Sequence, residues 1–224
     1  VRGRVDERMF YGPKLELWTE VSTEPGSNSF RIEDTLTNRG GDAQEFQLIY
    51  HANFGPPLLG ENSKLIAALK QVTPFNAHAA KSVRTFDTYA APKLGFIEQV
   101  YCLRPIADSL GITTVLLQNA SGTKGASMRF RVEQLPYLTL WKNTNSEKEG
   151  YVTGIEPGTG FPYNRRIERH FGRVPKLAAG ATRKFQLDFS ILNGAEQVNA
   201  TADAIRTLQG AVKPQIDEAA AALP

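Results

Sequence analysis

The sequence predicts an all-β protein: an antiparallel β-sandwich followed by a C-terminal helical segment. Two observations support this fold class. Apolar and polar residues alternate with a period of two through much of the chain up to residue 192, as in strands with one packed face and one wetter face. Turn-forming clusters recur about every 8–15 residues, a spacing typical of a sandwich.

The alternation is clear in residues 29–38 (SFRIEDTLTN), where Phe30, Ile32 and Leu36 share one face. It is clearest in residues 181–192 (ATRKFQLDFSIL), which continue this pattern to the end of the sandwich. Other strands are predicted at residues 14–21, 43–54, 95–103, 111–119, 128–135 and 151–156.

The C-terminal segment has a different pattern. Residues 198–224 are rich in alanine, and Ala204, Ile205, Leu208 and Val212 follow helical spacing. Asn199 or Thr201 is expected to cap a helix, and Pro214 is expected to kink or divide it. We therefore divide the chain into a sandwich domain, residues 1–192, and a helical appendage, residues 193–224.

Composition limits the classes of function. The formal net charge is +3 and the basic residues are scattered, so no nucleic-acid-binding stripe is predicted. No apolar run approaches the ~18 residues of a membrane span. Cys102 is the single cysteine, which excludes an intrachain disulfide and favours a reducing, cytoplasmic location. The chain opens in the middle of a pattern, and we expect an N-terminal part to precede Val1.

The sequence contains no metal-binding spacing, phosphate-binding loop or nucleophile elbow. What remains is acid–base chemistry. His51 and Asn53 alternate onto one face of a strand that ends before a Gly-Pro-Pro turn. The alternative for His51 is a structural hydrogen bond at the rim of a sheet.

Three carboxylate or aromatic positions extend this candidate site. Glu156 is predicted to end a strand before Pro157, where partial burial would raise its pKa and suit it as a general base. Glu98 is predicted among apolar neighbours, either as a buried ion-pair partner or lining a cavity. Trp141 is predicted either to stack against a sugar or to be an ordinary core residue.

Five stretches together resemble the galactose mutarotase-like superfamily, and more closely its bacterial branch of aldose 1-epimerase-like proteins (domain of unknown function 4432). They are RIEDTLTN, YHANFGPPLL, GFIEQVY, LPYLTLWKN and GIEPGTGFPYNR, with the trailing LAAGATRKFQLDFSIL. The resemblance covers the chain to about residue 192. It implies the supersandwich fold of that superfamily, without its first strands.

The resemblance also implies roles for individual residues. His51 matches the family's general acid, Glu156 matches its general base, and Glu98 stands where the family carries a substrate-binding aspartate. Asn53, Trp141, Lys142 and Arg165 are expected to bind substrate, with Arg165 holding a hydroxyl or an anionic substituent. The implied activity is interconversion of sugar anomers, with a small carbohydrate as partner and no cofactor or metal.

The chain also departs from the family pattern. Gly158 stands where the classical enzymes have a glutamine after the base, and an H-G motif with a second sugar-binding histidine would lie upstream of Val1. Two alternatives to an enzyme therefore stay open: a saccharide-binding module without turnover, and a fragment of a larger sugar epimerase. The oligomeric state is undetermined, and a dimer is compatible with the sequence.

Overall fold

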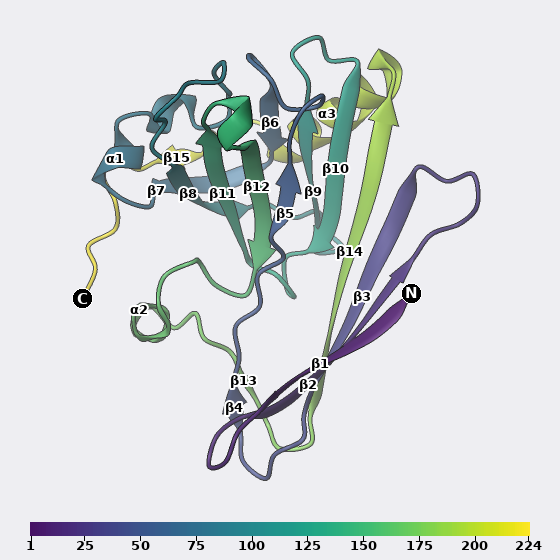
Figure 1. Cartoon of the computed structure of the whole chain (residues 1–224), viewed down its shortest axis with the longest axis vertical. Helices are drawn as coiled ribbons and strands as arrows, with labels where there is room; N and C mark the ends of the chain where they lie inside the picture. The colour runs from purple at the N-terminus through teal and green to yellow at the C-terminus, as the bar shows by residue number, and fades with distance from the viewer.

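Two large β-sheets lie face to face in the computed structural model, which describes residues 1–224 (Figure 1). The seven-stranded sheet has the order β1 (Arg2–Arg8), β2 (Lys14–Ser22), β3 (Ser29–Asn38), β14 (Thr182–Asn193), β10 (Lys124–Arg131), β9 (Ile112–Gln118) and β6 (Lys64–Ala67). The six-stranded sheet has the order β15 (Gln215–Ile216), β7 (Leu69–Pro74), β8 (Gln99–Pro105), β11 (Tyr137–Thr144), β12 (Tyr151–Gly158) and β5 (Ala52–Phe54).

The smaller elements are a two-stranded sheet, three α-helices and two 3₁₀ turns. They are β4 (Gln44–Glu45), β13 (Lys176–Leu177), α1 (Ala77–Ala80), α2 (Arg165–His170), α3 (Ala195–Gln209), η1 (Val83–Thr85) and η2 (Glu147–Glu149). All strand pairs are antiparallel except β15 with β7. The predicted antiparallel sandwich is therefore confirmed.

The main core fills the space between the two sheets, because both present their apolar faces to it. Met128 and Phe185 reach it from the seven-stranded sheet, and Tyr101, Leu138 and Ile155 reach it from the other. Alternation then turns the intervening side chains of β8, β11 and β12 to the opposite, outer face of the six-stranded sheet. That outer face carries the candidate site.

Helix α3 covers the outer face of the seven-stranded sheet. Val198, Ala202 and Ile205 on one side of the helix pack against Leu116 and Leu192. The helix ends at Gly210, and the chain after Pro214 adds β15 to the edge of the six-stranded sheet. The prediction that residues 193–224 are helical is thus correct for Ala195–Gln209 and wrong for the rest, because the helix ends at Gly210, whose φ is 58°, before Pro214 is reached. No helix combines the length and the apolar character needed to cross a bilayer.

Three other local predictions need correction. Gly194, not Asn199 or Thr201, stands at the N-terminus of α3. Residues 43–54 form two short strands, β4 and β5, rather than one. Strand β12 continues through Pro157 to Gly158, because the Pro157 carbonyl still accepts a hydrogen bond from the Tyr50 amide.

Candidate functional site

Five side chains form one row across the outer face of the six-stranded sheet. Thr73 on β7 pairs with Cys102 on β8, which pairs with Thr139 on β11, and Thr139 pairs with Glu156 on β12. On the last strand, Ala52 pairs with Ile155, so the preceding residue His51 lies beside Glu156. Strand pairing therefore brings together two residues that are about a hundred positions apart in the chain.

The His51 and Glu156 side chains are in direct contact. His51 Nε2 lies 3.0 Å from Glu156 Oε1, with the imidazole 52% exposed and the carboxylate 4% exposed. The ring nitrogen is not aligned for a hydrogen bond, so Oε1 has no hydrogen-bond donor although it is buried. The neighbouring Thr139 hydroxyl is also buried and unpartnered. Two adjacent buried polar groups beside His51 thus have no hydrogen-bond partner within the protein.

Burial determines the acid–base character of Glu156. Removal from water raises the pKa of this carboxyl above its ordinary value, and the charge of His51 opposes that shift only in part. The group is therefore poised to hold or release a proton closer to neutral pH than an exposed glutamate.

Tyr50 fixes the backbone from which His51 projects. Its hydroxyl donates a 2.5 Å hydrogen bond to Asp34 Oδ2 on β3, across the core in the other sheet. Its amide donates to the Pro157 carbonyl on β12. Because Tyr50 points into the core, alternation points His51 to the outer face.

Trp141 and Glu98 border the pair on its exposed side. The Trp141 ring stands edge-on to His51, with ring centroids 5.7 Å apart. Its indole Nε1 donates a 2.7 Å hydrogen bond to Glu98 Oε2. Glu98 is exposed, so the prediction of a buried carboxylate is wrong: it precedes β8 instead of lying within that strand. Asn53 is exposed and pairs with Gly154 beside Trp141.

Gly154 makes room for the pair. A Cβ at this position would lie 2.3 Å from Glu156 Oε1 and 3.2 Å from His51 Cε1. Any other residue here would displace the carboxylate from its present place.

Two predicted substrate-binding residues lie elsewhere. Lys142 is on the core face of β11, where its Nζ donates to the carbonyls of Thr85, Phe86 and Thr88. Burial there lowers its pKa to about 8. The Arg165 guanidinium donates to Gln47 Oε1 and lines a different surface with Glu45, Arg169 and Lys176. Alternation along β11 predicts the placement of Lys142, since it must face away from its neighbour Trp141.

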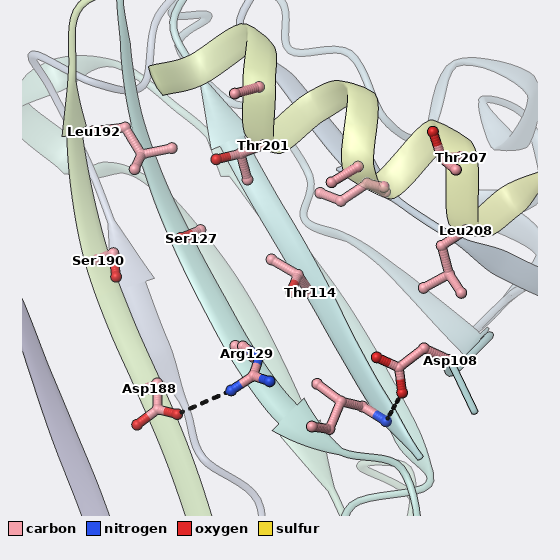
Figure 2. Close-up of a pocket in the computed structure, with 14 residues that line it drawn as sticks. Asp108, Thr114, Ser127, Arg129, Asp188, Ser190, Leu192, Thr201, Thr207 and Leu208 are labelled. Atoms are coloured by element: carbon pink, nitrogen blue, oxygen red, sulfur yellow. Dashed lines mark hydrogen bonds and ion pairs between the residues drawn. The ribbon is translucent and has the colours of Figure 1, made fainter. Parts of the chain in front are cut away.

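A hollow of about 680 Å³ lies on the other side of the molecule between α3 and the seven-stranded sheet. Figure 2 shows Ser190, Ser127 and Thr114 on the strands that form its floor, and Thr201 and Leu208 on helix α3 above them. None of the predicted site residues lines it. A second hollow, about 320 Å³, lies on the same face as His51 and Glu156 and includes Thr73 and Cys102 from their row. No three His, Cys, Asp or Glu side chains group closely enough to hold a metal ion.

Sequence reasoning missed several contributors to this face. Thr139 and Gly154 follow from alternation once strands β11 and β12 are paired, but their register is not readable from the sequence. Arg104 and Arg173 reach the second hollow from β8 and from the loop after α2, and no motif marks them.

Comparison with solved structures agrees with this architecture. A Klebsiella pneumoniae protein for which aldose 1-epimerase activity has been proposed is 42% identical, with a TM-score of 0.97 over 99% of this chain and 58% of that protein. A galactose mutarotase related enzyme from Lactobacillus acidophilus is 13% identical, with a TM-score of 0.55 over 83% of this chain and 64% of its own. An Escherichia coli K12 protein, also proposed to be an aldose 1-epimerase, is 9% identical with a TM-score of 0.56 over 86% of this chain and 65% of its own.

The chain therefore spans less than two thirds of the length of the Klebsiella protein. None of the curated proteins matches it. The family model for "Domain of unknown function (DUF4432)" matches residues 1–191, which is most of the chain. This match and the shared galactose mutarotase-like fold place the chain in the DUF4432 family.

Proposed function

We propose that the protein is an aldose 1-epimerase, which interconverts the anomers of a small sugar by acid–base catalysis at His51 and Glu156. The observation that carries the proposal is the 3.0 Å contact between an accessible imidazole and a buried carboxylate on one sheet face. The structural similarity of this chain to proteins named for aldose 1-epimerase or galactose mutarotase activity agrees with this reaction.

Ring opening and ring closure each need two proton transfers. Glu156 removes the proton of the anomeric hydroxyl while His51 donates a proton to the ring oxygen, and the bond between that oxygen and C1 breaks. The C1–C2 bond of the open aldehyde rotates. His51 then takes its proton back, Glu156 returns its own, and the ring closes on the opposite face of C1. Both residues end as they began.

The geometry suits these roles. The two oxygens that exchange protons are both bonded to C1, so the acid and the base must act close together. Glu156 is held by its burial, whereas the exposed His51 can swing aside to admit the sugar. Trp141 offers an aromatic surface for the apolar face of a pyranose, and Glu98 and Asn53 offer polar groups at its edge.

An anomer-resolved exchange experiment tests the proposal. NMR of freshly dissolved α-glucose or α-galactose should show faster exchange with the protein than in buffer, and the His51→Ala variant should lose this acceleration. Sugar binding without exchange would instead identify a saccharide-binding module.

The activity should fall in acid with a midpoint above the ordinary range of glutamate, about pH 4.3. The base must be ionised to accept a proton, and burial raises the pKa of Glu156, so activity is lost as the pH falls through that raised value. A pH profile of kcat/KM measures the midpoint. The Glu98→Gln variant should keep the same acid limb because Glu98 is exposed. An acid limb at or below pH 4.3 would argue against Glu156 as the base.

Replacing Gly154 with alanine should reduce the exchange rate by about 10²-fold, since a displacement near 1 Å can have that cost. The added methyl group would overlap Glu156 Oε1 and press on the His51 ring. Gly3→Ala is the matched control, because its Cβ would meet nothing within 4 Å. Equal rates for the two variants would show that the position of the carboxylate does not matter.

A further inference from the structure

The second hollow continues the candidate site along the same sheet face. It holds Thr73 and Cys102, which share a row with Glu156 across β11. Cys102 and Glu156 are separated by two strand spacings, or about 10 Å. A ligand with its reacting carbon at Glu156 can therefore extend a substituent into this hollow.

Two of the charged groups in the hollow, Arg173 and Asp217, already have hydrogen-bond partners within the protein. The Arg173 guanidinium forms two hydrogen bonds with the buried Glu168 carboxylate, at 2.8 and 2.6 Å. Asp217 accepts hydrogen bonds from Gln71, Thr73 and Gln215. Neither group needs a ligand to satisfy it.

Arg104 is the exception. Its guanidinium lies 5.2 Å from the centre of the Tyr137 ring, which orients it, but it has no carboxylate partner and no hydrogen bond. Arginine binds carboxylate, phosphate and sulfonate groups through its paired N–H donors. A stacked but unpaired guanidinium beside a hollow is thus suited to bind an anionic group.

The rest of the lining limits what the hollow accepts. Tyr163 stacks on Phe75 at 4.2 Å and donates a hydrogen bond to its carbonyl, which fixes one wall. Ala219 and Ala221 of the C-terminal tail form another wall, and both follow the part of the chain matched by the family model. Burial raises the pKa of the Cys102 thiol to about 12, so this residue lines the hollow as an uncharged group.

We propose that this hollow is a subsite for an anionic substituent on the sugar, carried on the carbon farthest from the anomeric centre and bound by Arg104. The inference rests on the proposed function for the position of the anomeric carbon. It assigns the substrate class as acidic sugars, either hexuronates or hexose 6-phosphates, which share a negative charge at the sixth carbon.

Binding and anomer exchange, measured separately on the complete polypeptide, test this inference. Glucuronate and galacturonate are compared with glucose and galactose, which place a neutral hydroxyl where the uronates have a carboxylate. Glucose 6-phosphate tests whether the larger anion also fits. The uronates or the phosphate should bind at least tenfold more tightly than the neutral sugars. Arg104→Met should weaken their binding by about 10–100-fold, the range for hydrogen bonds to charged groups, with little effect on the neutral sugars.

Arg166→Met is the matched control. It removes the same charge from an exposed residue of α2 that does not line the hollow, so it should leave the preference unchanged. Equal binding of acidic and neutral sugars, or an equal effect of the two arginine variants, would overturn the subsite. If no sugar exchanges but uronate binding still depends on Arg104, the proposed function fails and the subsite stands. If exchange occurs without preference for the anion, the subsite fails and the function stands.

Discussion

Replacing Glu156 with glutamine is expected to slow anomer exchange by about 10²–10⁴-fold, the usual contribution of a general base. Glutamine keeps the size of the side chain and can still contact His51, but it cannot accept a proton from the anomeric hydroxyl. The residual exchange rate of the variant should also no longer fall in acid, because the carboxyl group whose protonation causes that fall is absent. Exchange measured by NMR across a pH series records both effects.

Two comparisons make this result interpretable. Glu24→Gln changes an exposed carboxylate and should leave the rate unchanged. The double variant His51→Ala, Glu156→Gln should be hardly slower than either single variant, because the two groups act on the same transition state. A Glu156→Gln rate within a few-fold of the unchanged protein would remove this residue from the mechanism.

Replacing Glu168 with glutamine is expected to destabilise the fold by about 3–5 kcal/mol, the cost of removing one partner of a buried ion pair. Its carboxylate is fully buried and binds both Arg173 and the Phe161 amide. Without that charge, the guanidinium stays buried among Phe161, Phe171 and Tyr137 with no counter-charge. Urea unfolding of the variant measures the loss.

The same helix supplies a matched control. Arg169 on α2 pairs with Glu45 at the surface, where the arginine is 53% exposed. Glu45→Gln should cost at most about 1 kcal/mol because water screens exposed pairs. If Glu168→Gln does not fold, the double variant Glu168→Met, Arg173→Met should recover much of the stability, since no unpaired charge remains. Equal losses for Glu45→Gln and Glu168→Gln would contradict the argument.

The sequence predicts those parts of the fold that depend on local pattern. Strand β3 matches residues 29–38, and β14 nearly matches residues 181–192, because alternation along one strand determines which face is buried. It fails where tertiary contacts decide the structure. Residues 46–51, between β4 and β5, have strand-like alternation but form only an isolated bridge, from Ile49 to Gly158, because their backbone hydrogen bonds go to separate segments and build no continuous ladder.

The candidate site divides in the same way. The shared direction of His51 and Asn53 follows from alternation, and so does the opposite direction of Lys142. The contact between His51 and Glu156 depends on the pairing of β5 with β12, which the sequence does not specify. Arg104 has no sequence signal, because its lack of an ion-pair partner is a property of the folded surface.

The hydrogen bond from Tyr50 to Asp34 links the edge of the six-stranded sheet that carries His51 to a strand of the other sheet. A small sliding of the two layers against each other would therefore be transmitted to the imidazole next to Tyr50. Substitutions in β3, remote from any sugar, would then alter turnover as well as thermal resistance. An evolutionary drift in β3 would have to preserve the alignment of the layers, and not merely their packing.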